Sequence, residues 1–379
     1  MRITGVDAVA LRQPVLDEER YDPSQEVVIV RVATDTGAVG LAECNHSALP
    51  AKAVVDAAGS NLIGAGIAPV LVGRDPEERE TVVRELVERN VFSLRRGLGL
   101  AVLHGIDVCL WDLVAQGRGE PLWRTLWGDA ARPPRPYLTL YTGGGAYEES
   151  LERLERLIAD GMPLGYRAAK LEPLVDCVPE ERIADFVARG RGLLGEECEL
   201  YVDFGHRFTS AHHARPFIDA IAAYGPRLVE TPMHTDDVWE YARLAELVDV
   251  PLAASELYES PWEFRALLDV GNAAVVQPWI NRVGITGTLE VADMAGQRGR
   301  RCLLAGWNTT PIGVAAALHV AAGLGDGVTL EHAPVEAYGF ELRAVANPDP
   351  QVVEGVLALP DAPGLGVTLD EAAVRRFCL

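Results

Sequence analysis

The segments ELYVDFG at residues 199–205, RLVETP at 227–232 and VPLAASE at 250–256 decide how this chain folds. Each is a short apolar run that ends at or near an acidic residue. Runs of four to eight apolar residues are typical of buried strands, and the intervals between them are long enough for a helix and its turns. The three segments therefore predict successive strand-helix units of a parallel sheet.

Five further segments show the same texture on either side of these three. They are PYLTLYTGG (136–144), YRAAKLEP (166–173), AAVVQPW (273–279), CLLAGWN (302–308) and VTLEHAP (328–334). Eight strands with intervening helical patterns suit a TIM barrel, which typically needs about 250 residues. We predict an α/β fold with a TIM-like (β/α)7β barrel as the catalytic domain, over residues 131–350.

The amino-terminal third has a different pattern. QEVVIVRVATDTGAVGLAEC at residues 25–44 contains two alternating apolar runs separated by turn residues at 34–37, as in a hairpin. Helical spacing follows Asp75-Pro76, and a second helix is expected over about 99–117. We predict an α+β capping domain over 1–130, with the Pro- and Gly-rich segment 351–379 packing back on it.

Composition narrows the class of protein. The 379 residues carry a formal charge of −21, which repels nucleic acid and anionic lipid, so neither is an expected partner. The first residues lack a signal-peptide pattern, and no run reaches roughly 18 apolar residues, so we expect a soluble cytoplasmic protein. The six cysteines form no CxxC pair and are expected to be reduced, structural thiols.

Three acids mark the carboxyl ends of consecutive predicted strands: Asp203, Glu230 and Glu256, at intervals of 27 and 26 residues. In a TIM barrel these ends face the active site, so the three side chains would converge. Converging carboxylates repel one another and need a cation, and ligands that are all oxygen favour Mg²⁺. The alternative is that each acid caps the helix after its strand.

The chain resembles the enolase superfamily, and within it the branch of mandelate racemase and muconate lactonizing enzyme. The resemblance rests on VVIVRVATDTGAVGLAEC, on IDVCLWDLVAQGRGEPLWRTLWG (106–128), on the three acidic strands, and on VVQPWINRVGITG and AGWNTTPIGVAAALH. It implies that one Mg²⁺ binds a substrate carboxylate and stabilises the enediolate formed when a barrel base removes the α-proton.

The second strand departs from the branch's Lys-x-Lys pattern, because it reads Lys170-Leu171-Glu172. Residues two apart on a strand share a face, so both charged side chains should point into the barrel. Lys170 is then either the base or a cation that orients Glu172, and a purely structural ion pair is the remaining alternative.

The branch's second base, a histidine on the seventh strand supported by an aspartate on the sixth, is missing. Trp279 stands where the aspartate belongs and Ala305 where the histidine belongs, so racemisation by two bases is not expected. Trp279, Trp307 and Asn308 are expected at the barrel mouth, where they could shape the substrate pocket.

Two other ionisable residues are candidates for acid-base work. His206 lies three residues after Asp203, near a position where some acid-sugar dehydratases of the superfamily have a functional histidine. Glu331 falls where the branch has a glutamate that donates a hydrogen bond to the substrate carboxylate, and His332 follows it. Helix capping for Glu331 and a solvated loop position for His206 are the alternatives.

These observations favour an enzyme that removes the α-proton of a small hydroxy-carboxylate, with acid-sugar dehydration as the first hypothesis. A cycloisomerase or epimerase of the same superfamily, and a carboxylate-binding protein that has lost catalysis, remain open. Substrate specificity is expected from capping-domain loops at about 14–25 and 44–50, with Arg12, Tyr21, Asn45 and His46 as candidates. The family also implies a homo-oligomer.

Overall fold

A computed structural model describes residues 1–18, 25–306, 310–333 and 340–379. Its largest sheet has eight strands in the order β12-β11-β10-β9-β8-β7-β6-β13, and every pair in it is parallel. The strands are β6 (Arg135–Leu140), β7 (Ala168–Leu171), β8 (Glu199–Asp203), β9 (Pro226–Glu230), β10 (Leu252–Ala254), β11 (Val275–Val276), β12 (Arg301–Cys302) and β13 (Val328–His332). A parallel bridge between Leu304 and Leu330 joins the two edges of this sheet into a barrel.

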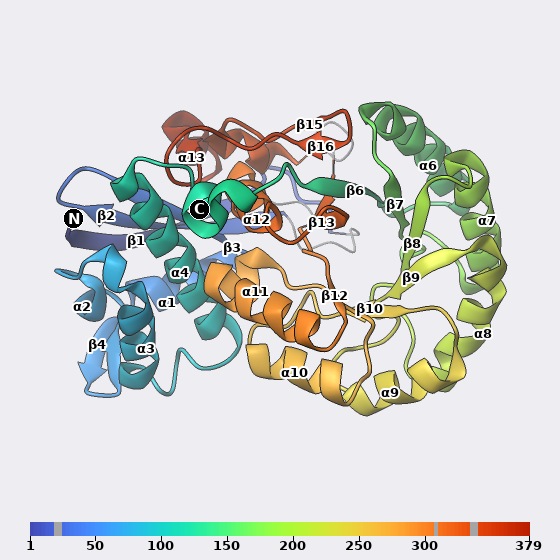
Figure 1. The fold of residues 1–379 in the computed structure, drawn as a ribbon, viewed down its shortest axis with the longest axis horizontal. Coiled ribbons are helices and arrows are strands. Elements are labelled where there is room, and N and C mark those ends of the chain that lie inside the picture. Colours follow the sequence, from blue (N-terminus) through green and yellow to red (C-terminus); the bar gives the residue numbers. More distant parts are fainter. Residues whose placement is uncertain (19–24, 307–309, 334–339) are drawn as a thin grey trace.

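Seven helices connect these strands and cover the outside of the barrel, as Figure 1 shows for the arc from α6 to α9. They are α6 (Tyr147–Gly161), α7 (Ile183–Leu194), α8 (Ala211–Ile221), α9 (Val238–Leu247), α10 (Pro261–Asp269), α11 (Ile280–Gln297) and α12 (Pro311–Ala321). Helices α6 to α10 each bury one side against the sheet, whereas every residue of α12 is buried. The predicted (β/α)7β barrel is confirmed.

Side chains that point into the barrel form layers. One buried cluster contains a single residue from each of seven strands: Tyr137, Ala168, Tyr201, Leu228, Ala253, Val275 and Leu303. Because side chains alternate between the two faces of a strand, the residues two positions further along also face the interior. That next layer includes Lys170, Asp203, Glu230 and Gln277, so it is polar where the first layer is apolar.

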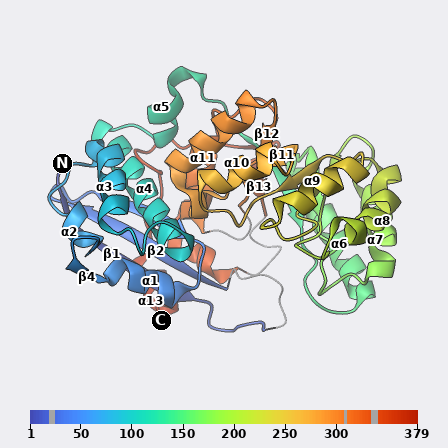
Figure 2. The same cartoon turned by 90° about the horizontal axis from the view of Figure 1, so that it is seen from below.

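The amino-terminal residues form a separate layer of strands and helices on one side of the barrel (Figure 2). Strands β1 (Ile3–Arg12), β2 (Glu26–Thr34) and β3 (Val39–Cys44) pair antiparallel, as the predicted hairpin requires. Helices α1 (Ala48–Asp56), α2 (Ala68–Leu71), α3 (Arg79–Arg89), α4 (Gly97–Arg118) and α5 (Leu122–Trp127) and the short strands β4 (Ala58–Asn61) and β5 (Gly64–Gly66) complete this part.

Helix α4 connects the two parts of the chain. It is the one described helix long and apolar enough to cross a membrane, but 83% of its most apolar window is buried inside the fold. It packs on α11, where His104 Nδ1 lies 2.6 Å from the carbonyl oxygen of Arg282. A Cβ atom at Gly284 would lie 3.0 Å from the backbone carbonyl oxygen of His104, and the backbone of Gly284 has φ 70°. Glycine therefore permits the close approach of the two helices.

The carboxyl-terminal residues return to the amino-terminal sheet. Short strands β14 (Ala346–Asn347) and β17 (Thr368–Leu369) pair, as do β15 (Val352–Val353) and β16 (Val356–Leu357). Helix α13 (Glu371–Phe377) follows, and the backbone NH of Leu379 donates to the carbonyl of Ala10 in β1. The domain boundaries expected at 130 and 350 stay predictions.

Candidate active site

A buried lysine lies at the centre of the candidate site. Lys170 Nζ is 2.9 Å from Glu230 Oε1, 2.9 Å from Glu331 Oε1, 3.1 Å from Asp203 Oδ2 and 3.4 Å from Glu172 Oε1. The lysine side chain is 2% exposed, so these contacts form away from solvent. Four strands, β7, β8, β9 and β13, each supply at least one of the five residues, because their interior positions near the carboxyl ends meet on the barrel axis.

The charges in this cluster do not balance. One ammonium faces four carboxylates, and Glu256 adds a further acid nearby. Burial, followed by the charge of Asp203, raises the pKa of Glu230 well above its usual value and that of Glu256 to about 7. Burial alone would lower the pKa of Lys170, but the surrounding carboxylates, Glu230 first, raise it well above its usual value.

Glu331 is held as a hydrogen-bond acceptor at both oxygens. The hydroxyl of Thr139 donates to Oε1 over 2.5 Å, and the backbone NH of Gly306 donates to Oε2 over 3.1 Å. With Lys170 also on Oε1, this geometry suits an ionised carboxylate. The expected donation from Glu331 to a substrate carboxylate would require a different arrangement of these contacts and stays a prediction.

Glu256 lies beside the loop that follows β8. Its Oε1 lies 3.8 Å from His206 Nε2. Ser255, which precedes it, has φ 98°, so the chain leaves the extended conformation just after β10 and redirects the next side chain. His206 also has a positive φ, 61°, and its ring stacks on that of His234 with 5.0 Å between centroids.

The donor chemistry fits Mg²⁺, although the side chains are not yet in a coordinating arrangement. Within the described parts of the chain, no three His, Cys, Asp or Glu side chains are placed so that they could hold a metal ion together. Lys170 stands between the acids, and Glu256 turns toward His206. However, Asp203, Glu230 and Glu256 offer only oxygen donors, and Glu230 Oε2 is buried without a hydrogen-bond partner.

Trp279 and Ala305, the two positions where the sequence predicts that a second base is missing, lie side by side. Trp279 and Ala305 form a parallel bridge just beyond β11 and β12. Trp279 is 5% exposed, and its indole NH has no partner among the described residues. The other expected pocket residues, Trp307 and Asn308, lie outside the described residues, as does Tyr21.

His332 does not join the cluster. It follows Glu331 on β13 and therefore faces the other side of the strand. Its Nδ1 lies 2.7 Å from the hydroxyl oxygen of Tyr166, and burial lowers its pKa to about 3. It is a neutral, packed residue rather than an acid-base group of this site.

Several residues near the site were not anticipated from the sequence. Glu43 of β3 is buried and accepts hydrogen bonds from the backbone NH of Thr310, over 2.8 Å, and from the side-chain amide of Asn281, over 2.9 Å. Through these hydrogen bonds Glu43 links the amino-terminal sheet to the amino ends of α12 and α11. The sequence signal was weak, because an acid in an apolar strand can also face solvent at a sheet edge.

A polar contact also links the capping loop 44–50 to the barrel. His46 Nε2 lies 2.7 Å from Glu259 Oε1, and Arg282 Nη1 lies 3.3 Å from the same oxygen. Asn45 Oδ1 accepts from Arg282 over 3.5 Å. The loop expected to influence specificity is therefore fixed to the loop after β10 and to α11. Arg12 instead pairs with Glu26 over 2.8 Å.

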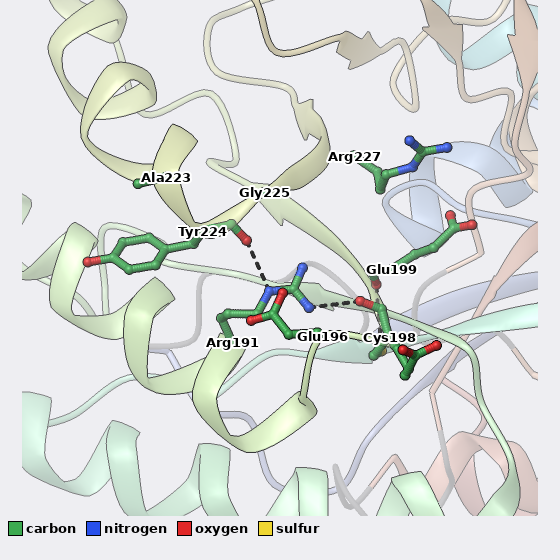
Figure 3. Close-up of a pocket in the computed structure, with 9 residues that line it drawn as sticks. Arg191, Glu196, Cys198, Glu199, Ala223, Tyr224, Gly225 and Arg227 are labelled. Carbon is green, nitrogen blue, oxygen red and sulfur yellow. Dashed lines mark hydrogen bonds between the residues drawn. The ribbon is translucent and has the colours of Figure 1, made fainter.

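A pocket of about 280 Å³ lies at the opposite end of the barrel (Figure 3). Its walls include Glu199 and Arg227, near the amino ends of β8 and β9. Arg191 donates to the carbonyls of Tyr224, over 3.0 Å, and of Cys198, over 2.8 Å. Residues at this end of a TIM barrel serve stability, so we assign no catalytic role to this pocket.

Comparison with known proteins agrees with this geometry. Residues 6–127 match the model of the mandelate racemase / muconate lactonizing enzyme amino-terminal domain, and residues 149–373 match the enolase C-terminal domain-like model. D-galactonate dehydratase of Ralstonia nicotianae is 30% identical over 357 residues, covering 92% of this chain and 90% of that protein. D-galactarolactone cycloisomerase of Agrobacterium fabrum is 28% identical over 363 residues, with the same coverage of both chains.

Solved structures show the same fold. A racemase from Streptomyces coelicolor A3(2) with bound magnesium superimposes with a TM-score of 0.82 at 22% identity and full coverage of both chains. At that identity the likeness concerns the fold alone. The two family models together span most of the chain, and this protein belongs to the enolase superfamily, in the branch of mandelate racemase and muconate lactonizing enzyme.

Proposed function

We propose that this enzyme removes the α-proton of a small hydroxy-carboxylate with the help of Mg²⁺, and that the favoured reaction is dehydration of an acid sugar. The observation that carries the proposal is the group of carboxylates around Lys170 at the carboxyl ends of the barrel strands. Burial and mutual repulsion disfavour the ionised form of these carboxylates, and a bound cation would stabilise it and offer a position for a substrate carboxylate.

Asp203, Glu230 and Glu256 would hold the metal, since they come from three adjacent strands and have oxygen donors only. Bound Mg²⁺ would supply positive charge to the substrate carboxylate as its α-proton leaves. The racemase structure with bound magnesium supports the choice of ion for this fold.

Glu172 is the preferred base. It follows Lys170 on the same interior face of β7, one layer nearer the barrel mouth, so an entering substrate meets it first. Lys170 is fixed by four carboxylates, a geometry that suits a cation that orients Glu172. His206, in the loop after β8, would give a proton to the departing hydroxyl, so that the β-hydroxyl leaves as water and the enol becomes a 2-keto acid.

The relatives support this reaction class and one alternative. One is named a D-galactonate dehydratase, and a second is named a D-galactarolactone cycloisomerase. Both names concern acid-sugar chemistry. Cycloisomerisation also needs only one base, so the absence of an acid or base side chain at Trp279 and Ala305 does not exclude it. The domain organisation and the expected self-association remain part of this proposal.

The decisive experiment is incubation of the Mg²⁺-loaded protein with a panel of acid sugars and aldarolactones in D₂O. Formation of a 2-keto acid that has lost one water relative to its substrate would establish dehydration. An isomerised product that carries one deuterium would establish the cycloisomerase. If no compound exchanges its α-hydrogen or changes the melting temperature, the protein binds no member of this substrate class, and the proposal fails.

Variants then assign the base. Glu172→Gln should remove α-hydrogen exchange altogether, because the amide cannot accept the proton. His206→Asn should leave exchange in place and slow the release of water. The reverse pattern would make His206 the base. Lys52→Met, on the surface of α1, is a control for a charge change outside the site.

A further inference from the structure

Gln277 has a buried side-chain amide without a partner among the described residues. It lies two residues beyond Val275, whose side chain belongs to the barrel's interior cluster, so Gln277 faces the interior as well. The residue is 1% exposed, and neither its side-chain nitrogen nor its side-chain oxygen has a hydrogen-bond partner among the described residues. Unpaired buried polar atoms are unfavourable, so such a group needs a partner such as a bound ligand or an ordered water molecule.

The amide is next to the proposed active site. The backbone NH of Gln277 donates to the hydroxyl oxygen of Ser255 over 3.0 Å, and Glu256 follows that serine. Trp279, one layer nearer the mouth on the same face, has a second unpartnered donor, its indole NH. Gln277, Trp279 and Ala305 together form one wall of the barrel interior. Ala305, which bridges to Trp279, adds only a methyl group to this wall.

The hydrogen-bonding capacity of this wall selects a type of ligand group. An amide offers two donors and one acceptor, and an indole offers one donor. A carboxylate can only accept and would leave the amide oxygen unpaired, and an ammonium can only donate. A hydroxyl group both donates and accepts, so a single hydroxyl can pair with the amide oxygen and with one of the amide N–H groups. The wall carries no charge of its own that would attract an ionic group.

We propose that Gln277 and Trp279 bind a hydroxyl group of the substrate, which makes the substrate a polyhydroxylated carboxylate rather than an aryl or alkyl hydroxy acid. This inference rests on the proposed function and narrows its substrate class. The two residues act in recognition and orientation. The substrate's carboxylate end lies with Asp203, Glu230 and Glu256, and the hydroxylated chain lies against β11 and β12.

The test compares parent protein and Gln277→Met, an unbranched change that removes both polar atoms. The ligands are the acid sugar whose α-hydrogen exchanges fastest and its monodeoxy analogues at carbons other than the α and β positions. For one analogue, parent kcat/KM should be about 10- to 100-fold lower than for the full sugar. In Gln277→Met, kcat/KM should be about equal for the full sugar and for this analogue. Trp279→Phe should reduce the ratio of the two kcat/KM values.

Thermal unfolding of the metal-free, ligand-free protein supplies a readout apart from activity. The melting temperature of Gln277→Met should equal or exceed that of the parent, because the variant removes a polar group that has no protein partner. Thr329→Val is the matched control. Its hydroxyl is also buried and unpartnered, but it lies two residues before Glu331 and so deeper in the barrel. It should keep the parent's preference among the sugars.

Two results would overturn the inference. One is a lower melting temperature of Gln277→Met together with an equal loss for every ligand, which would show a structural amide. The other is an unchanged preference among the monodeoxy sugars. If the parent itself exchanges no α-hydrogen of any acid sugar, the proposed function has failed, and this inference fails with it. Exchange by the parent without a change in preference overturns this inference alone.

Discussion

Lys170 Nζ lies 2.9 Å from Glu230 Oε1 in the interior of the barrel, where neither side chain reaches solvent. The two residues come from β7 and β9, with β8 between them. Through its contacts with Glu230 and Asp203, the lysine ammonium lies against two acids that are expected to coordinate Mg²⁺. The cation within this cluster therefore influences both the stability of the barrel and its chemistry.

Replacing Lys170 with methionine should make stability depend on the metal. The variant leaves the buried carboxylates without their ammonium partner, and breaking a buried ion pair in this way costs about 3 kcal/mol of unfolding free energy. Mg²⁺ should restore more stability to Lys170→Met than to the parent. Chemical denaturation with EDTA and with Mg²⁺ measures both, and Lys52→Met, an exposed pair with Asp56, is the control. If Mg²⁺ raised the unfolding free energy of all three proteins equally, Lys170 and Mg²⁺ would not neutralise the same carboxylates.

Replacing Glu230 with glutamine should weaken Mg²⁺ binding. The amide has the same shape but no charge, and metal affinity for oxygen ligands depends strongly on the number of charged donors. We expect a loss of about 100-fold or more in affinity by calorimetric titration, together with loss of α-hydrogen exchange. Glu199→Gln, at the opposite end of the barrel, should change neither. Unaltered Mg²⁺ affinity in Glu230→Gln would exclude this residue as a ligand.

Most of the barrel could be predicted because its signal is local. All eight strands overlap the apolar runs, although β6, β9 and β12 begin one residue before theirs and several strands are shorter than the runs. Strand β11 ends at Val276, two residues before Pro278, which cannot donate to a sheet. Strand β10 ends at Ala254, before the positive φ of Ser255. Such ends depend on backbone conformation and pairing, which apolar patterns do not encode.

The candidate site could be predicted only in part. The period of two places Lys170 and Glu172 on one face, and the structure shows them 3.4 Å apart. The contacts of Lys170 with Glu230 and Glu331 depend on strand tilt and on closure of the barrel, which bring distant strands together. The partnerless amide of Gln277 was also invisible, because a sequence does not show whether a polar side chain finds a partner.

The buried acid Glu43 should make stability depend on pH. Burial raises its folded-state pKa to about 7, although hydrogen bonds from Thr310 oppose the shift. The unfolded value is about 4.5, so the folded protein holds this proton more tightly. The tighter proton binding by Glu43 adds about 3 kcal/mol to the unfolding free energy. This stabilisation is fully present below pH 4.5 and is lost as the pH rises through about 7.

Denaturant titrations at pH 5 and pH 8 measure this contribution as the difference between parent and Glu43→Gln. The variant carries no ionisable group at this position, so its stability should fall less between the two pH values. Glu80→Gln, on the exposed side of α3, should follow the parent. Parallel pH profiles for all three proteins would show that Glu43 is ionised in the folded state at pH 5.

The opposite end of the barrel should affect stability without affecting chemistry. Arg191 is 8% exposed and donates to the carbonyls of Gly195, Cys198 and Tyr224, which join the end of α7 to the amino ends of β8 and β9. Arg191→Met leaves these carbonyls without the charged donor, so we expect the unfolding free energy to fall by about 2–4 kcal/mol. Mg²⁺ affinity and kcat per folded molecule should stay within twofold of the parent, because the carboxylate cluster lies at the other ends of the strands.

A variant that unfolds at the parent's denaturant concentration would show that water replaces the guanidinium at no cost. A selective loss of Mg²⁺ affinity would instead show that the two ends of the barrel are coupled through β8 and β9.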